Sequence, residues 1–283
     1  MTQFSLSPWQ QLSDRTWLAV AEPDSVNIGL VAGDEGCVLI DCGSTPAQGR
    51  QIRQAVAEVT DRPLRGVIVT HAHRDHWFGL AAFDDLDSWG HEGLAEARED
   101  AALLADAADL GVAAEELRVP SRPLSLVAGI DLGNQWIEAL HVGPGHSPHD
   151  VIVVVGAEQL VFAGDVVEGT PDSQNRPAPE YGPDSQAEPW SLAVDAVVSA
   201  MTKPGWRAVP GHGPLLDKEE VSWQRGLHAV VHGETHRLGR EGVGVDEAAE
   251  AGHWPWDYER VRAYVERELP TLRRRRQLPL GPV

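Results

Sequence analysis

The sequence is poor in cysteine, in lysine and in positive charge. Its two cysteines, Cys37 and Cys42, lie in one apolar segment, so a disulfide framework is excluded and small buried side chains are expected. The 283 residues include 43 acidic residues against 23 lysine and arginine residues, which gives a formal net charge of -20. A field of that sign repels phosphate backbones and anionic membrane surfaces, so we expect no nucleic-acid partner.

Long apolar runs are also absent. No stretch approaches the roughly 20 apolar residues that cross a bilayer, which predicts that the chain has no membrane partner. Residues 1–9 lack a basic patch followed by an apolar stretch, so they show no secretory signal and we expect a cytoplasmic location. With 42% hydrophobic and 23% charged residues, the chain has the composition of a globular protein.

Short runs rich in Val, Ile and Leu alternate with helical stretches over most of the chain. The predicted strands are residues 27–32, 37–41, 66–70, 136–142, 151–155, 160–163 and 206–209. The predicted helices are residues 46–59, 92–110 and 189–201. This alternation is typical of a mixed α/β (α+β) fold, in which sheets are covered by helices.

Beyond residue 216 the strand signals fade. Residues 218–233, 246–252 and 257–269 are predicted to be helical, so we expect a domain over residues 1–216 and a C-terminal helical extension over residues 217–283 that packs on it. The basic run Arg273 to Arg276 is interpreted as a solvated tail. Before the extension, the long loop 170–189 contains five prolines, and loops of this length are often functional.

The strongest chemical signal follows the strand predicted at residues 66–70. Four side chains that can bind a metal lie there within six residues: His71, His73, Asp75 and His76. Neutral imidazole nitrogens and carboxylate oxygens are ligands that zinc and similar metals favour, and an open loop leaves coordination positions for water. A single histidine is more often an ordinary surface or core residue, but this spacing favours a metal site.

Three further candidates each lie close to the end of an apolar strand. They are His146, Asp165 and His212, and each has a glycine beside it. Loops that follow different strands can meet at one edge of a sheet, and glycine permits close approach of the backbone. We therefore expect these side chains to join the first cluster.

Together these motifs resemble those of the metallo-β-lactamase fold superfamily, and the resemblance covers residues 27–213. It implies a four-layer αββα sandwich, with residues 1–216 as the catalytic domain, and it implies that Asp41 supports the metal loops from behind. An Asp at position 165, where many zinc β-lactamases use Cys, favours the broader hydrolases. In the glyoxalase-II-like and lactonase-like pattern, the first metal is held by His71, His73 and His146, the second by Asp75, His76 and His212, and Asp165 bridges them.

Two divalent metal ions are therefore the implied cofactor. We expect Zn2+, although such ligands also accept Mn2+ or Fe2+. Two cations lower the pKa of a shared water and so give a hydroxide near neutral pH. We expect this hydroxide to cleave an ester, thioester, lactone or amide bond in a small-molecule substrate, with Asp75 as the catalytic residue that orients the water. A homo-oligomer is compatible with the sequence.

Other residues near these motifs are candidate substrate contacts. Packing is the alternative for the tryptophans, because aromatic side chains normally bury large areas in cores. For the candidate histidine the alternative is an ordinary loop position. These candidates are Trp77, His149, Arg176 and Trp190.

Other functions remain open at this stage. Relatives with this fold include iron-dependent oxidoreductases that oxidise persulfides, but their metal sites lack part of the ligand set present here. A phosphodiesterase would use the same centre, and a metal-binding module without activity is a further alternative. Hydrolysis of β-lactams is not favoured, because neither Lys203 nor Lys218 lies in the loop 170–189, where Arg176 is the obvious cation.

Overall fold

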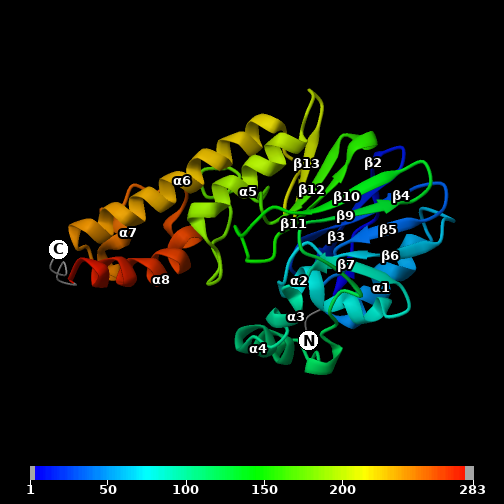
Figure 1. Ribbon diagram of the computed structural model, residues 1–283, viewed down its shortest axis with the longest axis horizontal. Coiled ribbons are helices and arrows are strands. Elements are labelled where there is room, and N and C mark those ends of the chain that lie inside the picture. The colour runs from blue at the N-terminus through cyan, green and yellow to red at the C-terminus, as the bar shows by residue number, and fades with distance from the viewer. Residues whose placement is uncertain (1–3, 278–283) are drawn as a thin grey trace.

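The computed structural model describes residues 4–277, with residues 273–277 described by their backbone alone. Two β-sheets lie face to face, and helices cover their outer faces (Figure 1). The first sheet has the order β1-β3-β4-β5-β6-β7-β8, with β2 paired to β3. Its strands are β1 (Ser5–Leu6), β2 (Gln10–Ser13), β3 (Thr16–Glu22), β4 (Val26–Ala32), β5 (Cys37–Ile40), β6 (Leu64–Ile68), β7 (Asp87–His91) and β8 (Arg122–Leu124).

The second sheet has five strands in the order β13-β12-β11-β10-β9. All neighbours in it are antiparallel except β12 and β13, which run parallel, so both of these strands deliver their carboxyl ends to the same edge. The strands are β9 (Val127–Asp131), β10 (Trp136–His141), β11 (Val151–Val155), β12 (Leu160–Gly164) and β13 (Arg207–Pro210).

The helices fall into two sets, one on each outer face. The set against the first sheet comprises α1 (Pro46–Val56), α2 (Arg74–Trp77), α3 (Leu94–Ala97) and α4 (Ala101–Asp109), with the 3-10 turns η1 (Phe78–Phe83) and η2 (Ala114–Glu116). The second set begins with α5 (Ala187–Ala200), after the turn η3 (Gly156–Glu158), and continues with α6 (Lys218–Glu241), η4 (Val245–Glu247), α7 (Ala248–Ala251) and α8 (Tyr258–Gln277).

Three apolar clusters fill the spaces between the four layers. In β5, Leu39 packs towards the first set of helices, whereas its neighbour Val38 packs against the second sheet. In β11, Val153 joins that central cluster while Ile152 packs with α5 and the C-terminal helices. Successive strand residues point to opposite faces, so each buried strand serves two clusters. The predicted αββα sandwich is confirmed.

One predicted helix, residues 92–110, is wrong as a continuous element. The chain breaks after α3, because Asp100 adopts an extended conformation and its carboxylate accepts hydrogen bonds from the main-chain N–H groups of Ala102 and Leu103. A side chain that caps orphan N–H groups in this way starts a new helix. Six strands were not predicted from the sequence: β1, β2, β3, β7, β8 and β9.

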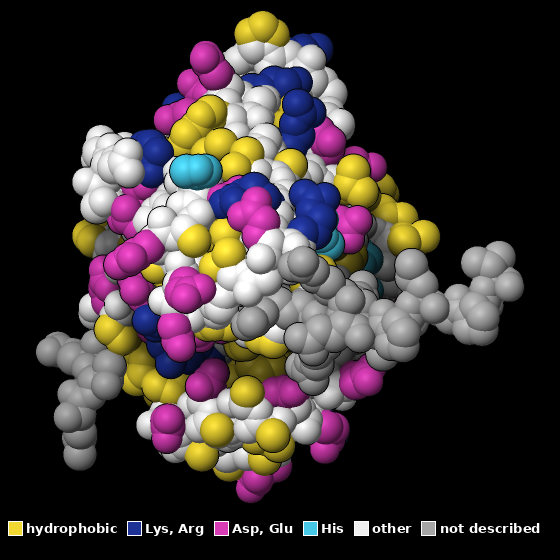
Figure 2. All heavy atoms as spheres, turned by 90° about the vertical axis from the view of Figure 1, so that its left-hand side faces the viewer, with side chains coloured by type: hydrophobic (Ala, Val, Ile, Leu, Met, Phe, Trp, Pro, Cys, Tyr) yellow, Lys and Arg dark blue, Asp and Glu magenta, His cyan; other side chains and the backbone are white. Residues whose placement is uncertain are grey.

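The C-terminal helices extend away from the sheets (Figure 1). Helix α6 runs past the predicted end at Gly233 and stops at Gly242, whose φ of 81° is the left-handed conformation that ends helices. Residues of α6 and α8 share one apolar cluster with α5 and β12. The face at this end carries acidic and basic side chains intermixed (Figure 2). The predicted tail, Arg273 to Arg276, lies outside the residues whose side chains are described, although its backbone continues α8.

Two smaller expectations concern cysteines and membranes. Cys37 and Cys42 are free and buried, as predicted, and burial raises the pKa of both thiols, that of Cys37 to about 11. Within residues 4–277 no helix is long and apolar enough to cross a membrane.

Candidate metal centre

Seven histidine and aspartate side chains converge at one edge of the sandwich, where β6, β12 and β13 end. They form two groups, and within each group one candidate ligand atom from every residue lies within 4.8 Å of the others. Sequence reasoning placed these residues at separate strand ends, and the fold brings them together. The first group is His71, His73, His146 and Asp165, and the second is Asp75, His76 and His212.

The first group has the spacing of a metal site. His146 Nε2 lies 2.8 Å from His73 Nδ1 and 3.3 Å from Asp165 Oδ2, and His71 Nε2 lies 3.8 Å from Asp165 Oδ2. Tetrahedral zinc, with bonds of about 2.0–2.2 Å, separates its ligand atoms by about 3.3 Å. His71 Nε2 and Asp165 Oδ1 are buried and find no hydrogen-bond partner among the described residues. Buried polar atoms normally have a partner, so a cation fits here.

The second group is similarly compact. Asp75 Oδ2 lies 3.1 Å from His212 Nε2 and 3.4 Å from His76 Nε2, and the two imidazole nitrogens are 3.4 Å apart. Two imidazoles and one carboxylate that face a common point leave a fourth position open, as in catalytic zinc sites.

Asp165 lies between the two groups. Its Oδ1 is 3.4 Å from His76 Nε2 in the second group. Its Oδ2 is 3.3 Å from His146 Nε2 in the first group and 3.6 Å from His212 Nε2 in the second. The carboxylate comes this close to the β13 loop because residue 211 is glycine: a Cβ there would lie 1.7 Å from Asp165 Oδ1. Gly211 is therefore part of the architecture that permits a bridging carboxylate.

Asp41 supports the second group from behind, as predicted. It has a φ of 64°, and its carboxylate accepts hydrogen bonds from the Thr70 N–H at 2.8 Å and from the Thr70 hydroxyl at 2.9 Å. It also accepts from His76 Nδ1 at 2.7 Å. This bond fixes the His76 tautomer and leaves Nε2 as the free ligand atom.

A corresponding carboxylate supports the first group, and sequence reasoning missed it. Asp184 Oδ2 accepts a hydrogen bond from His73 Nε2 at 3.1 Å, which turns His73 Nδ1 towards His146. Asp184 is in the proline-rich loop, 111 positions from its partner. No local motif marks it, so the contact emerges only from the folded chain.

Burial and mutual charge determine the protonation of the cluster. Burial lowers the pKa of His71 and lowers that of His146 to about 4, so both imidazoles are neutral, as metal ligands must be. Burial alone would raise the pKa of Asp75 and Asp165, but the adjacent His76 and His212 outweigh it and hold both carboxyls ionised. Burial opposes the charge on His212, yet Asp165 and Asp75 raise its pKa to about 12. A bound cation would displace that proton.

Both groups open into one cavity of about 530 Å3. Its opposite wall comes from the loop after β12 and from α8, and includes Glu168, Glu180 and Arg260. None of these three residues was predicted as a site residue, because none belongs to a motif. Burial raises the pKa of Glu168 to about 7, with a further contribution from Asp165.

None of the four predicted substrate contacts is among the described residues that line this cavity. Trp77 is fully buried in the cluster behind the first sheet, and its indole N–H donates to the Arg118 carbonyl. Trp190 is also fully buried, with its ring 5.5 Å from that of His146, so it packs behind a candidate ligand.

The two polar candidates are also outside the cavity lining. Arg176 forms an ion pair with Asp172 within its own loop at 2.5 Å. His149 is half-buried, and its ring lies 5.6 Å from that of His91. Direct substrate contact by any of the four residues stays a prediction, and the geometry does not favour it.

The family is decided by comparison with known proteins. The family model described as the metallo-beta-lactamase superfamily matches residues 21–212. The chain belongs to this superfamily. It is 25% identical over 193 residues to a metallo-beta-lactamase type 2 from Bacillus sp. (strain 170), a match that covers 67% of this chain and 68% of the relative.

The chain is also similar to a superfamily member with a different named activity and to solved structures. The chain is 33% identical over 163 residues to the human acyl-coenzyme A thioesterase MBLAC2, covering 50% of this chain and 58% of that protein. Among solved structures, a metallo-beta-lactamase from Pontibacter korlensis has a TM-score of 0.61 at 21% identity, covering 80% of this chain and 99% of that one. The chain is thus a metallo-β-lactamase superfamily hydrolase with a candidate metal-binding cluster.

Proposed function

We propose that the protein is a dinuclear metal-dependent hydrolase that cleaves an ester, thioester, lactone or amide bond. The observation that carries this proposal is the pair of ligand groups on either side of Asp165, at the separations that zinc coordination requires. Both groups face one cavity, so a substrate held there would meet both sites.

In this proposal His71, His73 and His146 would hold one ion, Asp75, His76 and His212 would hold the other, and Asp165, which lies between the two groups, would contribute to both. When bound, two divalent cations supply an activated water as the nucleophile and an electrophile for the substrate oxygen. Asp75 would orient this water for attack. Asp41 and Asp184 keep His76 and His73 in the tautomers that direct their free nitrogens inward.

Zinc is the proposed metal, and a cytoplasmic location and a small-molecule substrate are proposed with it. The relatives support hydrolysis in general: one is named as a thioesterase and others as β-lactamases.

The test is an activity screen with the metal content of each sample measured. Zinc-loaded protein is assayed on a lactone, a thioester, a β-lactam and a phosphodiester, beside an Asp75→Asn variant that has the same fold by circular dichroism. We expect hydrolysis of at least one carbonyl substrate and its loss in the variant. Equal activity in the two proteins, or cleavage of the phosphodiester alone, would refute the proposal.

A further inference from the structure

The side chains that line the metal cavity are charged or polar, apart from Gly182. Among the described residues, no Leu, Ile, Val, Met, Phe, Tyr or Trp side chain lines it. Most ligand sites bury apolar surface against such side chains, which this cavity lacks. The lining residues are Asp24, Ser25, His73, Asp75, His146, Asp165, Glu168, Thr170, Glu180, Gly182, His212 and Arg260.

Arg260 is the one arginine that the described side chains contribute to this lining, and its guanidinium has only long contacts. Its Nη1 lies 3.5 Å from Glu180 Oε2, and the Glu180 side chain is 74% exposed. Its Nη2 lies 3.5 Å from the Pro171 carbonyl oxygen. Both distances are at the limit of useful interaction, so the guanidinium retains donors for another group.

The neighbouring acids are more firmly engaged. Asp24 accepts from the Ser44 hydroxyl at 2.7 Å and pairs with Arg74 at 3.0 Å. Glu168 accepts from the Thr170 N–H at 2.7 Å. These two carboxylates therefore have close partners, whereas Arg260 has only the longer contact with the exposed Glu180 and the one with the Pro171 carbonyl.

The backbone of Arg260 is fixed even though its side chain is loosely paired. Its carbonyl accepts a hydrogen bond from the Tyr181 N–H at 2.8 Å, and its own N–H donates to the Asp257 carbonyl at 2.9 Å. The Arg260 side chain is only 23% exposed. A cation held in place before binding costs little ordering entropy when a ligand arrives.

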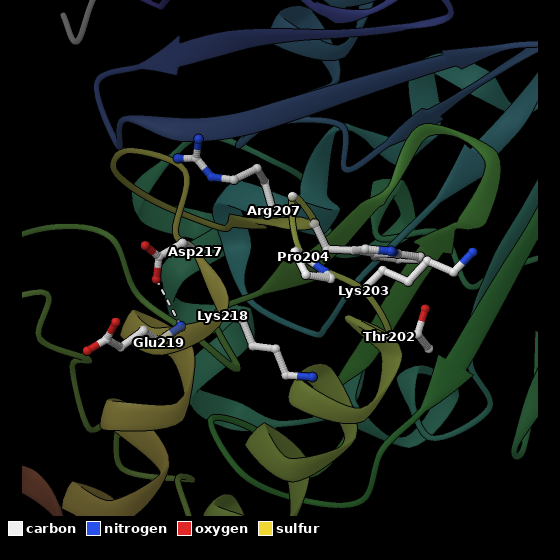
Figure 3. Close-up of a pocket in the computed structure, with 9 residues that line it drawn as sticks. Thr202, Lys203, Pro204, Arg207, Asp217, Lys218 and Glu219 are labelled. Carbon is white, nitrogen blue, oxygen red and sulfur yellow. Dashed lines mark hydrogen bonds between the residues drawn. The ribbon is translucent and has the colours of Figure 1, made fainter.

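A second cavity, of about 410 Å3, is a weaker anion site although it contains both lysines (Figure 3). Lys218 Nζ donates to the Met201 carbonyl at 2.7 Å, and Arg207 donates to the Leu215 carbonyl at 2.8 Å. Asp217 and Glu219 also line this cavity. Lys218 and Arg207 thus already donate to main-chain carbonyls, and the two acidic side chains offset part of the positive charge in this cavity.

We propose that Arg260 binds a carboxylate on the substrate and so selects small polar esters or thioesters that carry one negative charge. This inference rests on the proposed hydrolase function. A guanidinium pairs with a carboxylate through two parallel N–H···O bonds. A single arginine surrounded by acids suits a singly charged group, whereas a phosphate dianion would need further donors.

The test compares two probe esters, mono-p-nitrophenyl succinate and p-nitrophenyl acetate, with zinc-loaded protein. We expect Arg260→Gln to lower kcat/KM for the succinate ester by about 10- to 100-fold, mainly through KM, since hydrogen bonds to charged groups are worth about 1.5–3 kcal/mol. The acetate ester should lose far less. The matched control is Arg262→Gln on the same helix, where Arg262 pairs with Glu259 at 2.8 Å outside the cavity lining and should not affect either ester.

Failure of this inference is distinguishable from failure of the proposed function. Equal losses on both esters in Arg260→Gln, or an unchanged succinate ester, would overturn the role of Arg260 while leaving hydrolysis intact. If the wild type cleaves neither ester, the role of Arg260 is tested by calorimetric titration of the zinc-loaded protein with succinate, which measures the affinity for the carboxylate. Weaker succinate binding to Arg260→Gln than to wild type supports the inference, and equal binding overturns it.

Discussion

The two walls of the metal cavity are built in different ways. One wall consists of strand ends, and its ligands are oriented by buried partners such as Asp41 and Thr70. The other wall consists of the loop after β12 and of α8, and it carries the loosely paired Arg260 and Glu180. The difference suggests that the sheets fix the chemistry, while the loop and α8 determine which substrate is accepted.

The second wall is nevertheless held in place by the C-terminal helices. The Arg267 guanidinium donates to the carbonyls of Pro183 and Ser185, on either side of Asp184. The Trp256 indole donates to the Pro177 carbonyl at 3.1 Å. The loop is therefore clamped on α8, which links the C-terminal helices to His73 through Asp184.

The largest expected effect lies on the first wall, at the bridging position. Asp165→Asn keeps the size of the side chain but removes the charge that two cations would share. We expect metal content to fall and turnover to drop below detection, while circular dichroism stays unchanged. Measured metal and activity near the wild-type values would show that the strand-end wall does not carry the chemistry.

A smaller effect is expected where the two walls meet. Asp184→Asn removes the carboxylate that orients His73, and loss of such outer carboxylates typically costs about 10- to 100-fold in metal affinity or activity. Competition with a chelator measures the zinc affinity directly. The matched control is Asp195→Asn, because Asp195 is half-exposed and pairs with Arg225 at 2.6 Å away from the cavity. Equal affinities in the two variants would contradict the proposed role.

The next effect is on stability. It concerns the contact between Tyr181, in the loop after β12, and His228, in α6. The Tyr181 hydroxyl lies 2.5 Å from His228 Nδ1, so Tyr181→Phe leaves a buried imidazole nitrogen without its hydrogen-bond partner. The expected cost is about 1–3 kcal/mol, or several degrees in Tm. Thermal unfolding measures it, and zinc content should not change. A Tm within one degree or so of the wild type would mean that this bond does not hold the loop.

The smallest expected effect is a pH dependence of the stability at the same Tyr181–His228 contact. Burial lowers the pKa of His228 to about 3, so the folded protein keeps it neutral, whereas the unfolded chain binds a proton below a pH of about 6.5. His228 therefore contributes less stability as the pH falls from 6.5 towards 3. Between pH 7 and 5.5 the stability of wild type relative to His228→Gln should decline by about 1 kcal/mol. Urea unfolding at both pH values checks this, and a constant difference would contradict it.

The same contrast explains how much the sequence could predict. The long central strands and the strand-end ligands have local signals, because apolar runs and His-x-His-x-Asp-His spacing are visible within a few residues. Asp184, Arg260 and Glu168 have none, since their roles depend on contacts between distant segments. Short edge strands such as β8, with three residues, were missed for a similar reason: pairing rather than local pattern defines them. Trp77 and Trp190 were proposed as substrate contacts, but the fold buries both rings.

The most direct test of the central claim is the zinc stoichiometry of the purified chain. Metal-free protein is titrated with Zn2+, and the bound ions per chain are counted by calorimetry and elemental analysis. The account predicts two ions per wild-type chain and one per chain in His212→Ala, which removes one ligand of the second group alone. A single ion in the wild type, or two ions in both proteins, would contradict a dinuclear centre on these residues.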